Sequence, residues 1–416
     1  MSTAHRVETA VESLVDPPPE TGAGFPGLDS LRAVGAIAVL TTHVAFWAGS
    51  YTTHGWFGVL LGRLDVGVAI FFVLSGFLLG RPWLTRAAAG RPSPSARPYY
   101  WKRLLRIAPL YLLTVVLALG LIHANDGLGP SDWVITLLML NTFVDPALPA
   151  GLSHMWSLAV EVSFYLVLPV LMLALTGRRR LRTTRVLVGL GLLAATSVTW
   201  ILWVAPELRE TSSVMSGQWL PAYLTWFAAG LLIALVQVRV TQGRPARWMT
   251  ALVTLGGFPG ACWAAVAGLL LVCSTPIAGP TFLGTSTGAS DLTKHLLYAA
   301  IGFLLVLATV FAPARGRYLR AFAHPLARRL GWISYGIFCL HLPLLHFVIW
   351  ATGWPLFSGR AMAIWLLTVA VSVVAAELAY RFVERPALAW KNRPPRFLRA
   401  REDEKASAPV SGTSIR

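Results

Sequence analysis

The sequence predicts an all-α polytopic membrane helix bundle, and three observations support this fold class. Hydrophobic residues make up 56% of the 416 residues, charged residues make up only 13%, and the mean hydropathy is +0.62. Soluble domains carry about 25% charged residues, so this chain cannot form the polar surface that a soluble fold of its size needs. Apolar stretches of about 20 residues, the length of a membrane-spanning helix, recur along the chain. Soluble-enzyme folds are therefore excluded.

About ten candidate transmembrane helices follow from these stretches. They cover residues 29–48, 59–80, 107–124, 156–176, 186–206, 219–238, 249–273, 293–312, 330–351 and 361–381. Residues 1–25 and 391–416 are polar and are predicted to be disordered cytoplasmic tails on either side of a transmembrane domain at 26–390. No basic region precedes an apolar stretch in the first segment, so a cleavable signal peptide is not expected.

The basic residues indicate the orientation of the helices. The net charge of +17 comes from 35 Lys and Arg against 18 Asp and Glu, which in a soluble chain would suggest nucleic-acid binding. Here 27 of the 35 fall in five alternate connections, namely 81–106, 177–185, 239–248, 313–329 and 381–401, while the other connections contain only Arg209. Basic loops face the cytoplasm, so both termini are expected there and no nucleic-acid partner is predicted.

An eleventh apolar stretch, 133–144, is short and follows Pro130. An even number of crossings must separate the basic connections 81–106 and 177–185, and three apolar stretches lie between them. We therefore expect residues 133–144 to form a short re-entrant or surface helix. The three cysteines, Cys262, Cys273 and Cys339, lie in apolar runs without metal-ligand spacing, so neither disulfides nor a metal site are predicted.

Charged side chains at membrane depth are costly and usually mark a functional site. The first span begins with Asp29-Ser30-Leu31-Arg32 and reaches His43. Arg32 and His43 are three helical turns apart, so they share a helix face at a separation of about 16 Å, with His43 in the outer half of the membrane. A lone membrane histidine also fits a structural role, bonded to a neighbouring carbonyl group. The arginine on the same face favours a functional role.

The second span opens with Arg63-Leu64-Asp65 near its outer end and contains Ser75 within FFVLSGF (71–77). Asp65 can pair with Arg63 or with another group. Ser75 and Gly76 also fit a purely structural role, because small residues allow close packing of membrane helices.

The third span starts with YYWKRLLRIAP (99–109), in which Arg103 and Arg106 lie on one helix face at the cytoplasmic mouth of the bundle. Paired guanidinium groups suit bidentate binding of phosphate. Arginines beside a membrane also serve as topology signals and contact lipid headgroups, so the spacing alone leaves both roles open.

The fourth span, SHMWSLAVEVSFYLVLP (153–169), contains Glu161 in an otherwise apolar helix. Ser157 and Tyr165 precede and follow it by four residues and share its face. A buried glutamate close to the outer side needs a partner, a proton or a substrate. A structural ion pair is the alternative.

The ninth span, LGWISYGIFCLHLPLL (330–345), places Ser334 and His341 two turns apart on one face, with Tyr335 beside Ser334. His341 directly precedes Leu342-Pro343, so it also fits a role in capping a kink. The last span ends with FVERP (382–386), where Glu384 next to arginines predicts an interfacial ion pair.

In this order and placement, these stretches resemble the membrane acyltransferase-3 family of integral-membrane acetyltransferases. The resemblance runs from about Pro26 to Pro386, and the middle third matches only in hydropathy. Its motifs are LDSLRAVGAIAVLTTH (28–43), FFVLSGFLL (71–79), KRLLRIAPLY (102–111), WSLAVEVSFYLVLP (156–169), ISYGIFCLHLP (333–343) and the closing VERP. Two mild departures, at Ala108 and at Phe338-Cys339, do not touch the implied chemistry.

The resemblance implies an O-acyltransferase that moves an acyl group, commonly acetyl, from cytoplasmic acyl-coenzyme A to a hydroxyl group. The acceptor would be a carbohydrate, a glycolipid or a macrolide-like secondary metabolite. Arg32 and His43 match the family's Arg-x10-His, with His43 as the catalytic histidine. Arg103 and Arg106 match its Arg-x-x-Arg, proposed to hold the coenzyme A phosphates. Glu161 matches the acidic residue after Trp-Ser-Leu.

The implied mechanism has His43 remove the acceptor's proton as general base while the oxygen attacks the thioester. Glu161 would orient an imidazole or bind acceptor hydroxyls, and the second role is favoured because the span places it near the outer face. A covalent acyl group on Ser75 or on His43 is the alternative. Six further residues are candidates for substrate binding, namely Asp65, Ser75, Trp156, Ser157, Tyr335 and His341.

Two other classes of protein stay open, a secondary transporter and a non-catalytic sensor of acyl-coenzyme A or lipid. Transporters often show internal repeats and equivalent broken helices, and neither is evident here. A sensor need not keep the Arg-x10-His pattern. The Ala-, Arg- and Gly-rich composition suggests the cytoplasmic membrane of a high-GC bacterium, with membrane lipids as surroundings. A stand-alone form is expected, and no oligomeric state is indicated.

Overall fold

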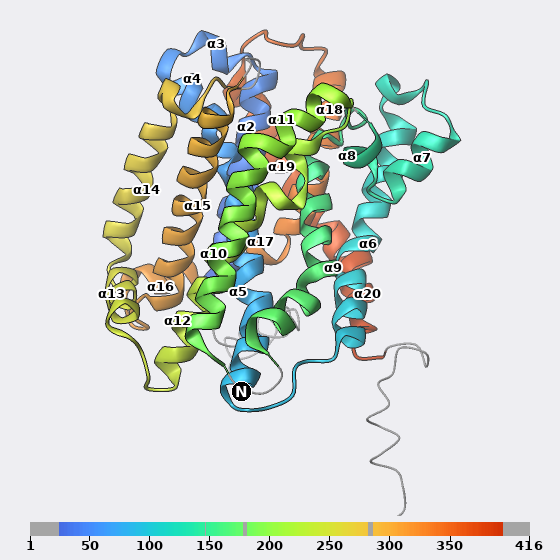
Figure 1. Ribbon diagram of the computed structural model, residues 1–416. Helices are drawn as coiled ribbons and strands as arrows, with labels where there is room; N and C mark the ends of the chain where they lie inside the picture. Colours follow the sequence, from blue (N-terminus) through green and yellow to red (C-terminus); the bar gives the residue numbers. More distant parts are fainter. Residues whose placement is uncertain (1–24, 146, 178–180, 282–285, 394–416) are drawn as a thin grey trace, which may run out of the picture.

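The computed structural model describes residues 25–145, 147–177, 181–281 and 286–393. Over these residues it is a bundle of helices without strands (Figure 1), so the predicted all-α membrane bundle is confirmed. Nine helical segments are long and apolar enough to cross a membrane, and one bent helix pair brings the number to ten if it counts as a span. The predicted tails, 1–25 and 391–416, lie outside the described residues except for Phe25 and residues 391–393.

All but one of the predicted spans fall on these nine segments, some of which join consecutive helices. They are Gly27–Trp47 (α2); Gly55–Ala88 (α4, Gly55–Gly62; η1, Arg63–Val66; α5, Gly67–Ala88); Ala96–Leu121 (α6); Ser153–Thr176 (η3, Ser153–Met155; α9, Trp156–Thr176); Thr183–Thr211 (α10, Thr183–Thr199, to α11, Ala205–Thr211); Ser216–Thr241 (η5, Ser216–Gln218; α12, Leu220–Thr241); Gly288–Phe311 (α15); Ser334–Thr352 (α18); and Ala361–Ala389 (α19, Ala361–Ala379, to α20, Arg385–Ala389).

The exception is the predicted span 249–273, which is not one straight helix. It consists of α13 (Arg247–Gly256) and α14 (Pro259–Cys273), which meet at an angle of 86°. Pro259 lacks a backbone N–H and disfavours helical geometry in Phe258, which adopts φ −112° and ψ 71°. If the pair counts as one span, the predicted basic connections 239–248 and 313–329 lie on the same side of the membrane, as expected from the sequence.

The short stretch 133–144 forms two non-spanning helices, α7 (Pro130–Leu137) and α8 (Asn141–Val144), as expected for a re-entrant or surface segment. The Tyr111 hydroxyl of α6 donates to the Thr136 carbonyl, and the Trp219 indole N–H donates to the Thr142 carbonyl at 2.8 Å. These bonds hold the segment against α6 and the start of α12. In Figure 1, α7 and α8 lie near the same end as α4.

Close packing between α5 and α12 fixes the orientation of α5. A Cβ atom at Gly76 would overlap the Phe227 backbone, and one at Gly230 would overlap the backbone of Val73. Phe227 stacks on Phe72 with ring centroids 4.7 Å apart. Gly76 therefore has the predicted packing role, and the neighbouring Ser75 faces a different side of α5.

Candidate active site

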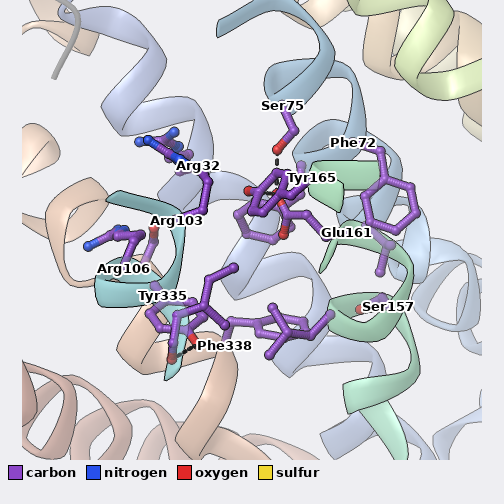
Figure 2. Close-up of a pocket in the computed structure, with 15 residues that line it drawn as sticks. Arg32, Phe72, Ser75, Arg103, Arg106, Ser157, Glu161, Tyr165, Tyr335 and Phe338 are labelled. Atoms are coloured by element: carbon purple, nitrogen blue, oxygen red, sulfur yellow. Dashed lines mark hydrogen bonds between the residues drawn. The ribbon is translucent and has the colours of Figure 1, made fainter. Parts of the chain in front are cut away.

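A polar cavity lies inside the bundle between α2, α5, α6, α9 and α18 (Figure 2). The fold brings together seven of the predicted site residues along its walls, namely Arg32, Ser75, Arg103, Arg106, Ser157, Glu161 and Tyr335. These residues come from five helices far apart in the sequence. The cavity is narrow, with a volume of about 80 Å³.

Two arginines of α6 line this central cavity and contact aromatic rings. The Arg103 guanidinium carbon lies 5.7 Å from the centre of the Tyr165 ring, and that of Arg106 lies 5.5 Å from the centre of the Tyr335 ring. Arg106 also donates to Glu384 at 2.8 Å. The ion pair predicted for Glu384 therefore forms with an arginine of α6.

Arg32 brings a third guanidinium group from α2 to the same cavity. Figure 2 shows it on the same side of the view as Arg103 and Arg106. No carboxylate of the described residues forms an ion pair or hydrogen bond with Arg32. Three arginines thus line the cavity against one lining carboxylate, Glu161, with Glu384 behind Arg106. This excess of positive charge suits an anionic ligand.

Glu161 is held by two hydroxyl groups. The Ser75 hydroxyl of α5 and the Tyr165 hydroxyl both donate to Glu161 Oε1, the second at 2.6 Å. The predicted alignment of Tyr165 with Glu161 is therefore confirmed. Ser157 lines the same cavity, but its hydroxyl donates to the His154 carbonyl at 3.0 Å.

The surroundings of Glu161 differ from the expectation. The segment before α9 enters the bundle, where the His154 ring Nε2 lies 3.2 Å from the Cys339 carbonyl in the middle of α18. Helix α9 consequently starts at depth, and Glu161 shares the cavity of Arg103 and Arg106. The argument that favoured acceptor binding by Glu161, its expected place near the outer face, is therefore wrong.

Three histidines form a cluster beside the central cavity. His341 Nε2 lies 3.1 Å from His43 Nδ1, and the His154 ring centroid lies 4.6 Å from that of His341 and 6.1 Å from that of His43. Phe338, which lines the cavity, packs against the His154 ring at 5.1 Å. His43 and His341 were both predicted as site residues, and the fold brings them into contact.

Hydrogen bonding defines which nitrogen of His43 is available for chemistry. His341 Nδ1 lies 2.7 Å from the Phe338 carbonyl, so it carries the proton and leaves Nε2 as an acceptor. His43 Nδ1 lies 2.8 Å from the Val39 carbonyl and faces His341 Nε2, so it also carries a proton. His43 Nε2 is then an unprotonated nitrogen without a hydrogen-bond partner among the described residues. That is the form a general base requires.

His154 is the residue that sequence reasoning missed. It lies in a connection between predicted spans, where a histidine is not unusual. Residue spacing along a helix cannot predict that such a residue contacts another helix. The only available signal was its position two residues before the Trp156-Ser157 motif. The part of the chain that the structure describes contains no group of three or more His, Cys, Asp or Glu side chains that could hold a metal ion.

Asp65 and Trp156 are not in the central cavity. They line a separate pocket, where Asp65 accepts a hydrogen bond from the Lys294 ammonium group at 2.7 Å and another from the Tyr298 hydroxyl. Arg63, the partner considered for Asp65, donates to the Gly279 carbonyl instead.

Comparison with known proteins places the chain in a family. The family described as an acyltransferase domain, acyltransferase-3, matches residues 25–380, which include the five helices of the cavity. The peptidoglycan O-acetyltransferase OatA of Listeria monocytogenes is 28% identical over 381 residues, which cover 87% of this chain and 55% of that protein. The putative peptidoglycan O-acetyltransferase YrhL of Bacillus subtilis is 26% identical over 380 residues, or 87% and 54% of the two chains.

A third relative is nodulation protein 10 of Rhizobium leguminosarum, 25% identical over 387 residues that cover 86% of this chain and 92% of the relative. The chain thus spans about half the length of the first two relatives and nearly all of the third. No solved structure matches this chain. On the family match over most of its length, the chain belongs to the acyltransferase-3 family.

Proposed function

We propose that this protein is an O-acyltransferase of a bacterial cytoplasmic membrane that transfers an acyl group, acetyl in the first instance, from cytoplasmic acyl-coenzyme A. The acceptor is a hydroxyl group of a carbohydrate, a glycolipid or a macrolide-like metabolite. The observation that carries the proposal is the free Nε2 of His43 beside a cavity lined by three arginines and one carboxylate.

The donor side of the proposal rests on charge. Coenzyme A carries several phosphate groups. Arg103 and Arg106 lie in the first half of α6, within the basic connection 81–106 that is expected to face the cytoplasm. Arginine binds phosphate through two parallel N–H bonds. Arg106 already pairs with Glu384, so a phosphate competes with this carboxylate. The narrow cavity must widen before a pantetheine arm enters it.

His43 performs the acid–base step in this scheme. Its Nε2 takes the proton of the acceptor hydroxyl as the oxygen attacks the carbonyl carbon of the thioester. The carbon–sulfur bond then breaks, and the coenzyme A thiolate receives the proton from the imidazolium. His341 orients the imidazole through the contact of its Nε2 with His43 Nδ1 at 3.1 Å.

A two-step route through Ser75 is a second candidate mechanism. Ser75 donates a hydrogen bond to Glu161 inside the cavity, and a serine bonded to a basic group is the arrangement of an activated nucleophile. Trapping an acetyl group on Ser75, detected by mass spectrometry of the intact protein after acetyl-coenzyme A addition, would favour this route over direct transfer.

The test uses purified protein in liposomes with labelled acetyl-coenzyme A and candidate acceptors. Acylated product, confirmed by mass spectrometry, supports the proposal. Flux of a substrate into the liposomes without consumption of acetyl-coenzyme A would identify a transporter. Binding of acetyl-coenzyme A without any product would identify a sensor. Comparison of envelope glycans and lipids with and without the protein identifies the acceptor by the loss of an acyl ester.

A further inference from the structure

A second pocket lies at the outer side of the bundle, with a volume of about 310 Å³. We infer that this outer pocket binds a sugar ring of an uncharged carbohydrate acceptor, on an aromatic wall of Trp156, Tyr223 and Trp226, with Arg63, Asp65 and Lys294 as polar groups of the same lining. This inference rests on the proposed function. It assigns the acceptor to a pocket separate from the cavity that would hold the donor.

The outer position of the pocket follows from the helices that form it. Asp65 lies before α5, and Tyr223 and Lys294 lie in the first turns of α12 and α15. Each of these three helices leads from the pocket to a basic connection, 81–106, 239–248 or 313–329. Because basic connections face the cytoplasm, the pocket lies towards the opposite face, where an exported glycan is found.

The outer pocket adjoins the catalytic groups. Val68 lines both this pocket and the central cavity, and the consecutive residues Trp156 and Ser157 each line one of them. Gly62 also lines the pocket, and its carbonyl accepts a hydrogen bond at 3.2 Å from the hydroxyl of Thr42, the residue before His43. A ring bound here would thus lie next to the histidine cluster, away from the arginines that would hold a phosphorylated donor.

The aromatic wall presents fixed rings to the pocket. The Trp156 and Tyr223 ring centroids are 5.2 Å apart at 33°, and those of Tyr223 and Trp226 are 4.9 Å apart at 71°. The Trp226 indole N–H donates to the His295 carbonyl at 2.8 Å, which fixes its orientation. The face of an aromatic ring is electronegative, so it attracts the polarised C–H bonds on the apolar face of a sugar.

The pocket also contains hydrogen-bonding groups, some of them unsatisfied. Arg63 is only 2% exposed, yet its Nε has no hydrogen-bond partner among the described residues. Within the same described part of the chain, His295 Nδ1 and Gln218 Oε1 are also buried without a partner. All three residues line the pocket. Buried polar groups are normally hydrogen-bonded, so these donors and acceptors point to a hydroxylated ligand.

The charges of the pocket select against an anionic ligand. Two carboxylates, Asp65 and Asp291, line it together with Arg63 and Lys294, so the lining charges balance. Arg209 lies 3.9 Å from Asp291 but is half-exposed, so water screens its charge. The central cavity, with three arginines and one carboxylate, has the opposite preference. A neutral sugar therefore fits the outer pocket better than an anionic one.

The experiment replaces one ring of the aromatic wall. Tyr223→Leu removes the aromatic face, while Tyr223→Phe keeps it. Trp203→Leu, at a residue that is 63% exposed on the outside of the bundle, controls for the loss of an aromatic side chain elsewhere. Wild type and variants are first presented with an array of neutral and anionic glycans. Acetyl transfer from acetyl-coenzyme A is then measured on the neutral glycans that bind.

We expect Tyr223→Leu to raise the KM for the neutral glycan about tenfold, Tyr223→Phe to restore it, and Trp203→Leu to behave as wild type. The KM for acetyl-coenzyme A should stay within about twofold of the wild-type value. Two results would overturn this inference but leave the proposed function intact. One is an unchanged KM for the glycan in Tyr223→Leu, and the other is a preference of the wild type for anionic glycans or for non-carbohydrate hydroxyls. Acetyl-coenzyme A binding without transfer to any hydroxyl compound would instead refute the proposed function.

Discussion

Variants of the Arg106–Glu384 ion pair can distinguish whether Arg106 binds the donor or only stabilises the fold. Glu384 is 2% exposed and its carboxylate lies 2.8 Å from the Arg106 guanidinium group. Glu384→Gln removes the negative charge with little change of shape and keeps the Arg106 guanidinium group. Arg106→Met removes the other partner and leaves a buried carboxylate without its cation.

The two variants are expected to change the affinity for coenzyme A in opposite directions. A phosphate on the far side of the guanidinium group would lie about 6 Å from the carboxylate, where two unit charges at an effective dielectric constant of about 20 repel by about 3 kcal/mol. Screening by the partly exposed surroundings reduces this value, so Glu384→Gln should tighten coenzyme A binding about tenfold to hundredfold. Arg106→Met should weaken binding and cost about 3–5 kcal/mol of stability.

The assay is calorimetric titration of coenzyme A into detergent-solubilised protein, with thermal unfolding of each variant measured in parallel. The double variant Arg106→Met/Glu384→Gln is the control for stability, because it removes both buried charges and should unfold at a higher temperature than Arg106→Met alone. Weaker coenzyme A binding by Glu384→Gln would refute the reasoning, since it would show that the carboxylate positions Arg106 and does not compete with the ligand.

Three further predictions follow from the same contacts. Arg103→Ala should weaken coenzyme A binding about tenfold or more through loss of charge-assisted hydrogen bonds, and an unchanged calorimetric affinity would remove its role. Gly76→Val should abolish folding or lower the unfolding temperature sharply, because its side chain would overlap the Phe227 backbone. Gly120→Val, at a helical glycine with no described atom within 4 Å of the added Cβ, should not. Ser75→Ala should keep turnover within about tenfold of wild type if transfer is direct, whereas complete loss together with trapped acetyl-Ser75 in the wild type would favour the covalent route.

Many residues of the candidate site could be predicted because their spacing places them on one face of a helix. Arg32 and His43, Arg103 and Arg106, and Glu161 and Tyr165 each share a helix face, and the fold directs these faces inward. The apolar stretches predicted the spans, and the alternating basic connections predicted that 133–144 does not span the membrane. These features depend only on neighbouring residues of one helix or on the charge of the connections between helices.

The features that sequence reasoning missed depend on contacts between distant segments. His154 meets Cys339, which follows it by 185 residues, and Lys294 meets Asp65, which precedes it by 229 residues. The depth at which α9 starts also depends on such contacts, so Glu161 could not be placed correctly from its position in a span. The 86° bend in 249–273 had a local signal in Gly257-Phe258-Pro259. The prediction missed it because the apolar stretch continues through these residues.

The central claim is that the free Nε2 of His43 acts as the base for acyl transfer, and the most direct test is turnover by His43→Ala. General-base catalysis contributes about 10²- to 10⁴-fold, so the account predicts a loss of at least about 100-fold in the rate of acylated product formation. Coenzyme A affinity should be unchanged, because the arginines would still hold the donor. Wild-type turnover by His43→Ala, with the same acylated product confirmed by mass spectrometry, would contradict the account.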